Sequence, residues 1–137
     1  MTTQAEIASL AAKLLEHERR SASGDRAAAS RVFEKMFVEL MPIVGERGVV
    51  AVFVRSAVGA KTECTPLEGL VLTIDSVGGV NANIRDHFAT LQDHDVDACA
   101  VALCGAFVAL MSRLIGFPLT LQLLQRAWPA VDLKETP

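Results

Sequence analysis

The sequence predicts an all-α fold, a single compact bundle of six or seven helices around a central apolar helix at about residues 95–115. Three observations favour this class. Apolar residues recur at helical spacing along most of the 137 residues, Pro and Gly separate these stretches, and residues 98–112 contain no charged side chain. A chain of this length buries roughly two thirds of its unfolded surface as one domain. We therefore assign residues 1–137 to a single helical domain, with a frayed tail at 130–137.

The first helix is expected to begin at Thr3, because Thr3 and Glu6 have the spacing of a capping box. Its apolar stripe follows the helical period. The stripe consists of Ile7, Leu10, Ala11, Leu14 and Leu15. The charged residues 16–20 are interpreted as a solvated helix end, and residues 21–24 as a short break.

A second amphipathic helix is predicted before Pro42. Its stripe consists of Val32, Phe33, Met36, Phe37, Leu40 and Met41. Pro42 is expected to end this helix and to start the next, because proline lacks the amide hydrogen that an internal helical residue donates. Residues 49–54 have strong β propensity, but no convincing partner strand is present, so we predict that they are helical.

Two short helices are predicted between residues 65 and 91. Residues 65–68 read Thr-Pro-Leu-Glu, a capping box with proline at the first helical position, which predicts a helix to about Val77. Gly78 and Gly79 are expected to end it. The asparagines at 81 and 83 are expected to open the next helix.

The central helix is expected to be capped by Asp93 or Asp95 and to end at Gly116. Its fifteen uncharged residues are fewer than the roughly 18 to 20 that span a bilayer, so a buried helix of a bundle is predicted rather than a membrane span. A ladder of small residues lets a neighbouring helix, from the same chain or from a second copy, approach closely. The ladder consists of Ala98, Ala102, Gly105, Ala106 and Ala109. A last helix is predicted from Pro118 to Pro129.

Composition and charge exclude several function classes. The net charge is −3, so no uniform basic field attracts nucleic acid or an anionic membrane, and neither is expected as a partner. The N-terminus lacks the basic-then-apolar order of a secretory signal, which predicts a cytoplasmic protein.

The three cysteines are odd in number and have no CxxC spacing, so no disulfide framework is expected. Cys99 and Cys104 are five residues apart, on different helix faces, and are interpreted as inert core thiols. Cys64 precedes the predicted cap at Thr65, so its thiolate is the one that a helix dipole could favour.

The densest polar cluster lies at residues 86–97. It contains the D-x-D-x-D alternation of a calcium loop, but the required glycine and glutamate positions are occupied by Ala98 and Cys104, which excludes an EF-hand. His87, His94 and Asp97 remain candidate ligands of a transition metal.

Three arginines lie in apolar surroundings and are candidate ligand-binding or anion-binding residues, namely Arg55, Arg113 and Arg126. The competing interpretation is structural. Their aliphatic stems can cover apolar surface, and Arg113 suits the negative end of a helix dipole.

The leading functional prediction is a non-enzymatic, self-associating interaction module with a regulatory or adaptor role and no cofactor. No P-loop, GxGxxG, GxSxG or zinc-knuckle pattern is present. Its candidate interface residues are Leu119, Leu123 and Trp128.

Two alternatives remain open. One is a metal-dependent enzyme that uses the cluster 86–97. The other is a helical sensor that encloses an apolar ligand, or a haem held by His87. The aromatic-lined pocket of such a sensor would consist of Phe33, Phe37, Phe53, Phe88, Phe107 and Met111.

Overall fold

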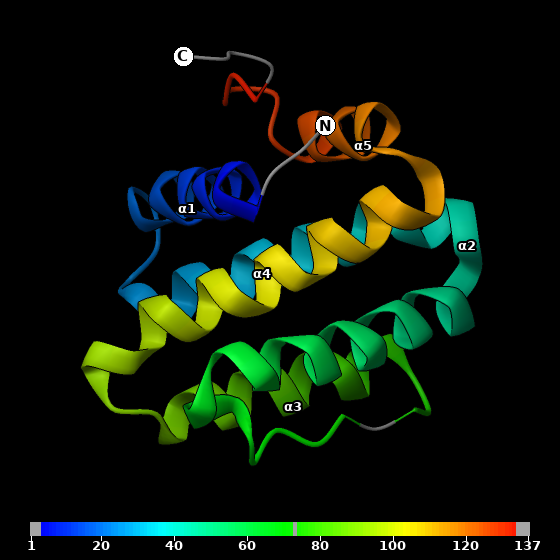
Figure 1. Ribbon diagram of the computed structural model, residues 1–137. Coiled ribbons are helices and arrows are strands. Elements are labelled where there is room, and N and C mark those ends of the chain that lie inside the picture. The colour runs from blue at the N-terminus through cyan, green and yellow to red at the C-terminus, as the bar shows by residue number, and fades with distance from the viewer. Residues whose placement is uncertain (1–3, 73, 134–137) are drawn as a thin grey trace.

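A computed structural model describes residues 4–72 and 74–133, and over these ranges the chain forms five α-helices and no strand (Figure 1). The helices are α1 (Gln4–Arg19), α2 (Asp25–Glu63), α3 (Val77–Thr90), α4 (Asp93–Ile115) and α5 (Phe117–Ala127). A single 3-10 turn, η1 (Thr65–Leu67), lies between α2 and α3. The predicted all-α class is confirmed, including the helical state of residues 49–54.

The prediction of six or seven helices is wrong, and the first reason lies in α2. Pro42 does not end the helix, and the break falls three residues later, at Gly45, whose φ of 73° and ψ of 171° are not helical. Glycine adopts a positive φ without the steric penalty that a Cβ atom imposes. The two halves of α2 consequently run back along each other as a hairpin, with its bend at Gly45 (Figure 1).

The second reason lies after residue 64. Only residues 65–67 are helical, as η1, and the helix predicted to run to Val77 is absent over the described residues 68–72 and 74–76. Helix α3 instead begins at Val77, because the Ser76 hydroxyl accepts a hydrogen bond from the Gly79 N–H at 3.0 Å. Gly78 and Gly79 were expected to end a helix, and they lie in the first turn of one.

Helix α4 is the predicted central helix, and the prediction of its extent is confirmed to within two residues. It packs against α1, α2, α5 and η1 (Figure 1). The expected cap by an aspartate is wrong: the N-cap residue is Gln92, whose side chain makes no capping hydrogen bond. Asp93 and Asp95 lie inside the first turn, where their charges favour the positive end of the helix dipole.

By length and composition, α4 is apolar enough to cross a membrane, and it is the one helix of the described residues that meets this criterion. This is weak evidence for a membrane span, because the core helix of a compact bundle meets the same criterion. The buried face of α4 contributes ten residues to the protein core, which accounts for its apolar character.

The small-residue ladder on α4 packs against α1, a helix of the same chain. A Cβ atom added at Gly105 would lie 3.7 Å from Cγ2 of Ile7, an ordinary van der Waals contact, so α1 packs directly against α4 there. Ala98 is exposed, whereas Ala102 and Ala106 are half-buried. Part of the ladder is therefore covered by α1.

Arg26, at the start of α2, fixes the turn between α3 and α4. Its guanidinium donates to the carbonyl oxygens of Phe88, at 3.0 Å, and Leu91, at 2.5 Å, at the C-terminal end of α3. It also bonds Asp93 at 2.9 Å. Unpaired carbonyls at the end of a helix need such donors, so Arg26 stabilises this corner.

The segment after α5 is held against the bundle as far as Leu133, which is buried. The Gln125 side chain donates to the carbonyl of Val131 at 2.6 Å and accepts from the Leu133 N–H at 3.3 Å. Residues 134–137 of the predicted frayed tail, and Thr3 of the first predicted cap, lie outside the described residues.

Candidate functional site

Large apolar side chains are exposed at the end of the bundle where α2 bends and α4 passes into α5. Ile43 and Val44 are 52% and 40% exposed, and Leu114 and Leu119 are 61% and 46% exposed. We call these four residues the bend surface. Burial of apolar area against a partner is the main favourable term in protein association, so this exposure is a physical reason to seek a partner here.

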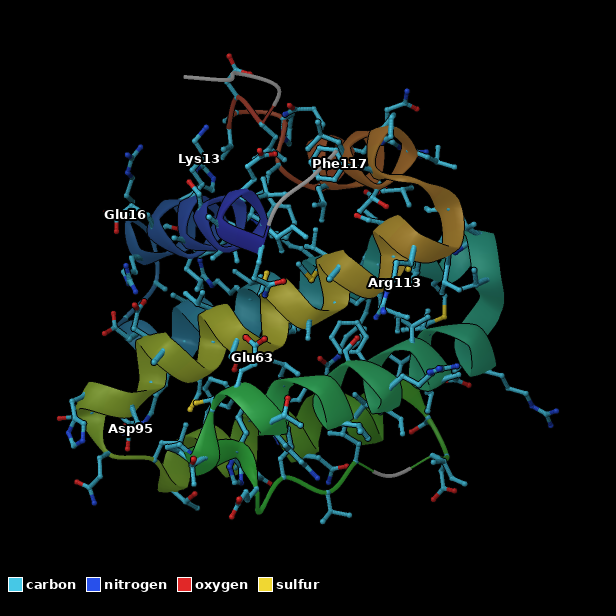
Figure 2. The ribbon with its side chains drawn as sticks, viewed as in Figure 1. Lys13, Glu16, Glu63, Asp95, Arg113 and Phe117 are labelled. Atoms are coloured by element: carbon cyan, nitrogen blue, oxygen red, sulfur yellow. The ribbon has the colours of Figure 1, made fainter. Side chains whose placement is uncertain are left out.

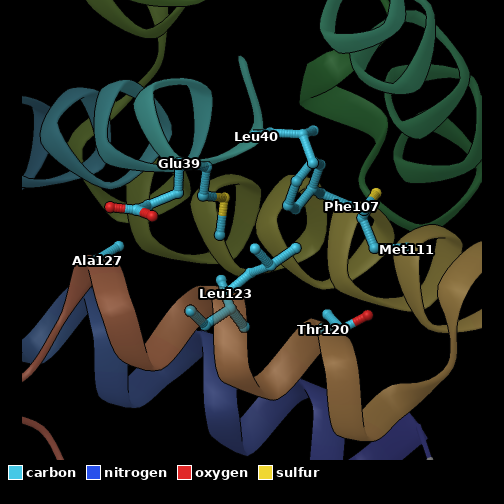
Figure 3. Close-up of a pocket in the computed structure, with 9 residues that line it drawn as sticks. Glu39, Leu40, Phe107, Met111, Thr120, Leu123 and Ala127 are labelled. Carbon is cyan, nitrogen blue, oxygen red and sulfur yellow. The ribbon is translucent and has the colours of Figure 1, made fainter. Parts of the chain in front are cut away.

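The packing beneath the bend surface shows why its residues gather. Leu40, Met111 and Thr120, from α2, α4 and α5, line one hollow (Figure 3). Ile43 lies three residues after Leu40, and Leu119 precedes Thr120. Figure 1 shows the bend of α2 and the α4–α5 turn at the same end of the molecule.

Glycine geometry creates both turns at this end. Gly45 interrupts α2 with a φ of 73°, and Gly116 separates α4 from α5 with a φ of 88°. Both values lie in the region that glycine reaches most easily. Rigid helices on either side of the two glycines hold the bend surface in place.

An open groove of about 340 Å³ lies between the first half of α2 and the end of α5. It is lined by Glu34, Lys35, Val38, Glu39, Arg126 and Ala127. Val38 is 68% exposed, and Arg126 lies 3.5 Å from Glu39. Leu119 and Arg126 are seven residues apart and share a face of α5, which joins this charged groove to the bend surface.

The hollow beneath α5 is too small for an organic ligand. Its volume of about 10 Å³ is the room that roughly one water needs, whereas small-molecule sites measure roughly 300–1,000 Å³. Its lining is almost entirely apolar, and Figure 3 shows α2, α4 and α5 contributing side chains to it. It is a packing defect at the junction of the three helices.

The aromatic residues of the predicted sensor pocket contact one another. The ring centroids of Phe37 and Phe53 are 4.3 Å apart, those of Phe53 and Phe107 are 4.5 Å apart, and Phe33 lies 6.1 Å from Phe53. Phe88 continues the cluster, 6.3 Å from Phe33. Their rings fill the space that an apolar ligand was expected to occupy.

The candidate metal ligands are not brought together. His87 Nε2 donates to the carbonyl oxygen of Pro66 at 2.9 Å, and Asp97 forms an ion pair with Arg19. His94 is exposed beside Asp95, 3.5 Å away. Over residues 4–72 and 74–133, no group of three or more His, Cys, Asp and Glu side chains is arranged to hold a metal ion.

The three candidate anion-binding arginines lie on three different helices. Arg55 lies on α2, Arg113 on α4 and Arg126 on α5, and all three are exposed. Figure 2 shows Arg113 extending from the C-terminal half of α4. Arg126 lines the charged groove and forms an ion pair with Glu39. Neither Arg55 nor Arg113 lines the groove or the hollow beneath α5. The three arginines therefore do not form a common anion-binding site.

The three candidate interface residues differ in exposure. Leu119 belongs to the bend surface, whereas Leu123 is 8% exposed and faces the hollow beneath α5. Trp128 is 1% exposed. Of the three, only Leu119 presents its side chain to a partner without rearrangement.

A buried polar cluster, which the sequence reasoning missed, surrounds Trp128. The indole Nε1–H donates to Oε2 of Glu18 at 2.7 Å, and Lys35 forms an ion pair with the same oxygen. The Lys35 ammonium also lies 5.7 Å from the centroid of the Trp128 ring, a cation–π distance. The cluster ties α1 to α2 and to the end of α5.

Electrostatics keep Glu18 ionised in this buried position. Burial raises the pKa of its carboxyl, but hydrogen bonds from Lys35 and Trp128 and the positive charge of Lys35 outweigh it, so the net pKa is lowered. The Glu18 carboxylate accepts hydrogen bonds from both Lys35 and Trp128, so we interpret the cluster as stabilising the fold rather than as a reactive site.

The prediction that residues 16–20 form a solvated end is wrong for Glu18, which is 1% exposed. A signal was present in the sequence. Glu18 follows Leu14 by four residues and thus occupies the next position of the apolar stripe of α1. A carboxylate on that stripe indicates a buried partner, but the period does not identify Lys35 or Trp128.

Comparisons with known proteins add no functional assignment: no family model, no curated protein and no solved structure matches this chain.

Proposed function

We propose that this protein is a non-enzymatic helical module that works by self-association, with a second copy seated on the bend surface and the adjoining charged groove. The observation that carries the proposal is the clustering of exposed apolar side chains. Of the eight large apolar side chains that are exposed among the described residues, five lie on these two features. They are Val38, Ile43, Val44, Leu114 and Leu119.

Charge favours a second copy as the occupant. The groove carries Glu34 and Glu39 together with Lys35 and Arg126, around the exposed Val38. A two-fold axis places each patch against its own copy, so cations of one chain can face carboxylates of the other. A patch with a single sign of charge would repel its copy, whereas this groove carries two acidic and two basic side chains.

The expected affinity follows from the apolar area. A side chain that is about half exposed contributes roughly 1 kcal/mol when it is buried. Five such side chains on each copy contribute on the order of 10 kcal/mol, which the loss of translational and rotational freedom offsets in large part. At most about 6 kcal/mol then remains, so we expect weak association, with a dissociation constant between tens of micromolar and about 1 mM.

We further propose a cytoplasmic setting and a regulatory or adaptor role. Cys64, Cys99 and Cys104 are free and buried, which suits a reducing compartment. The net charge of −3 gives no attraction to nucleic acid or to an anionic membrane, so we expect protein contacts to be the working interactions.

Light scattering after size exclusion tests both the association and its location. We expect the wild type to increase in mass with concentration, and Val38→Glu to stay monomeric or to weaken association at least about tenfold. Val58→Glu is the matched control, because Val58 is 62% exposed on the second half of α2, outside the proposed interface. Equal behaviour of the two folded variants would contradict the proposed location.

A further inference from the structure

Two cysteine side chains meet where the C-terminal end of α2 lies against the N-terminal part of α4. Cys64 and Cys99 are 35 residues apart in sequence, and their Sγ atoms are 2.7 Å apart. Both thiols are free, and both side chains are buried. Spacing along the sequence does not reveal this pair, because the contact is made by the packing of two helices.

Regular structure on each side holds the two sulfurs together. Cys64 is the C-cap residue of α2, and its N–H donates to the carbonyl oxygen of Ala60 at 2.9 Å. Cys99 lies in the second turn of α4, fully enclosed by the core. The helix dipole expected to act on Cys64 is absent, because the segment that follows is a single 3-10 turn.

We propose that Cys64 and Cys99 are a redox-modification site that forms a reversible intramolecular disulfide when the protein meets a low-molecular-mass disulfide such as oxidised glutathione. A disulfide requires two sulfurs about 2.05 Å apart, so these sulfurs need to approach by only roughly 0.7 Å. The inference is independent of the proposed self-association.

The reaction balances as two thiol–disulfide exchanges. The sulfur of Cys64 attacks one sulfur of the small disulfide, forms a mixed disulfide, and releases one small thiol that carries the Cys64 proton. The sulfur of Cys99 then attacks the Cys64 sulfur and displaces the second small thiol, which carries the Cys99 proton. The two protein thiols are oxidised by two electrons, and the small disulfide is reduced to two thiols.

Exposure sets the order of the two exchanges. Cys64 is 8% exposed and Cys99 is 0% exposed, so the external disulfide reaches Cys64 first. Burial, together with the Cys64 hydrogen bond and the charge of Asp95, raises the pKa of Cys99 to about 12. The second exchange therefore quickens as pH rises, because the attacking species is the thiolate.

The third cysteine is a bystander. Cys104 is fully buried, and burial raises the pKa of its thiol to about 12. It lies five residues beyond Cys99 on α4, so it points to a different face of the helix. Modification of Cys104 in the folded protein is not expected.

Oxidation of the folded full-length chain with glutathione disulfide tests the proposal. We expect an unchanged monomer or dimer distribution, the loss of two hydrogen masses, and one Cys64–Cys99 cross-link in a non-reducing peptide map, reversed by a thiol reductant. Cys99→Ser should instead stop at one glutathione adduct on Cys64. Cys104→Ala, which retains both reacting thiols, should behave as the wild type.

Three results would overturn the proposal. They are a stable glutathione adduct on Cys64 in the wild type, a disulfide between two chains, and thiols that stay unmodified in the folded protein while the urea-unfolded chain reacts. The peptide map of the wild type is decisive even where a serine or alanine variant folds poorly.

Discussion

Replacement of Lys35 by methionine is the most informative test of the buried cluster at Trp128. Glu18 is 1% exposed and receives hydrogen bonds from Lys35 and Trp128. Lys35→Met keeps the aliphatic stem and removes the charge. The carboxylate of Glu18 then stays buried with the indole N–H as its remaining donor from this cluster.

The two partners of the ion pair should not be equally sensitive. Removing one partner from a buried pair costs about 3 kcal/mol or more, because it leaves an uncompensated charge, and we expect about 3 kcal/mol for Lys35→Met. Glu18→Gln keeps an oxygen for the Trp128 N–H and leaves a lysine whose side chain is 41% exposed and hydrated. We expect it to cost about 1 kcal/mol.

The dependence on pH follows from the lowered pKa of Glu18. In the wild type, the stability that Glu18 contributes is present above its unfolded pKa of 4.5 and is lost as the pH falls through the lower folded value. Without Lys35, burial dominates and should raise the pKa of Glu18. The gap in unfolding free energy between the wild type and Lys35→Met should therefore narrow on acidification.

Urea unfolding followed by far-UV circular dichroism, at neutral pH and at about pH 4, measures these differences. Lys13→Met is the matched control, because Lys13 is exposed and bonds the Asp132 carbonyl at 3.0 Å; we expect a change within about 0.5 kcal/mol. Equal losses for Lys35→Met and Glu18→Gln, or a gap that widens in acid, would refute the reasoning.

Three further outcomes are expected. Gly45→Ala should cost about 2 kcal/mol in urea unfolding, because its φ of 73° and ψ of 171° lie in a region that is essentially restricted to glycine. Gly59→Ala, in the regular part of the same helix, should instead stabilise by up to about 1 kcal/mol. Neither added Cβ meets an atom within 4 Å. Arg26→Ala should lower the unfolding free energy by about 2 kcal/mol, and should raise amide exchange at the end of α3, because two half-buried carbonyl oxygens lose their donor. The Cys64–Cys99 disulfide should raise the unfolding free energy by about 4 kcal/mol by closing a loop over a separation of 35 residues, and an oxidised chain that melts no higher than the reduced one would contradict this.

The fold class could be predicted because its signals are local. The uncharged run at 98–112 lies within α4, and the helical period of residues 25–41 matches the first half of α2. The exact break in α2 could not be predicted in the same way. Pro42 is tolerated inside the helix, and the chain reverses at Gly45, where a positive φ is least costly.

The contacts that matter for the site are not local. The capping pattern at residues 65–68 competes with the cap at Ser76, and the structure places the helix after Ser76. Glu18 meets Trp128 across 110 residues, and Cys64 meets Cys99 across 35. Sequence patterns predict which residues share a helix face, whereas such pairs depend on how the faces pack.

The bend surface shows the same limit. Leu119 could be proposed as an interface residue from its helix, but Ile43 and Leu114 belong to the same exposed end only because the bend of α2 and the α4–α5 turn lie at one end of the molecule (Figure 1). Trp128, the most typical anchor of an interface by residue type, is instead held inside by Glu18.

Sedimentation equilibrium of the reduced wild-type chain, from micromolar to about millimolar concentration, tests self-association most directly. We expect a reversible shift from the 14.7 kDa monomer to a dimer of twice that mass as the concentration rises. A single species of monomer mass at every concentration up to the solubility limit would contradict it.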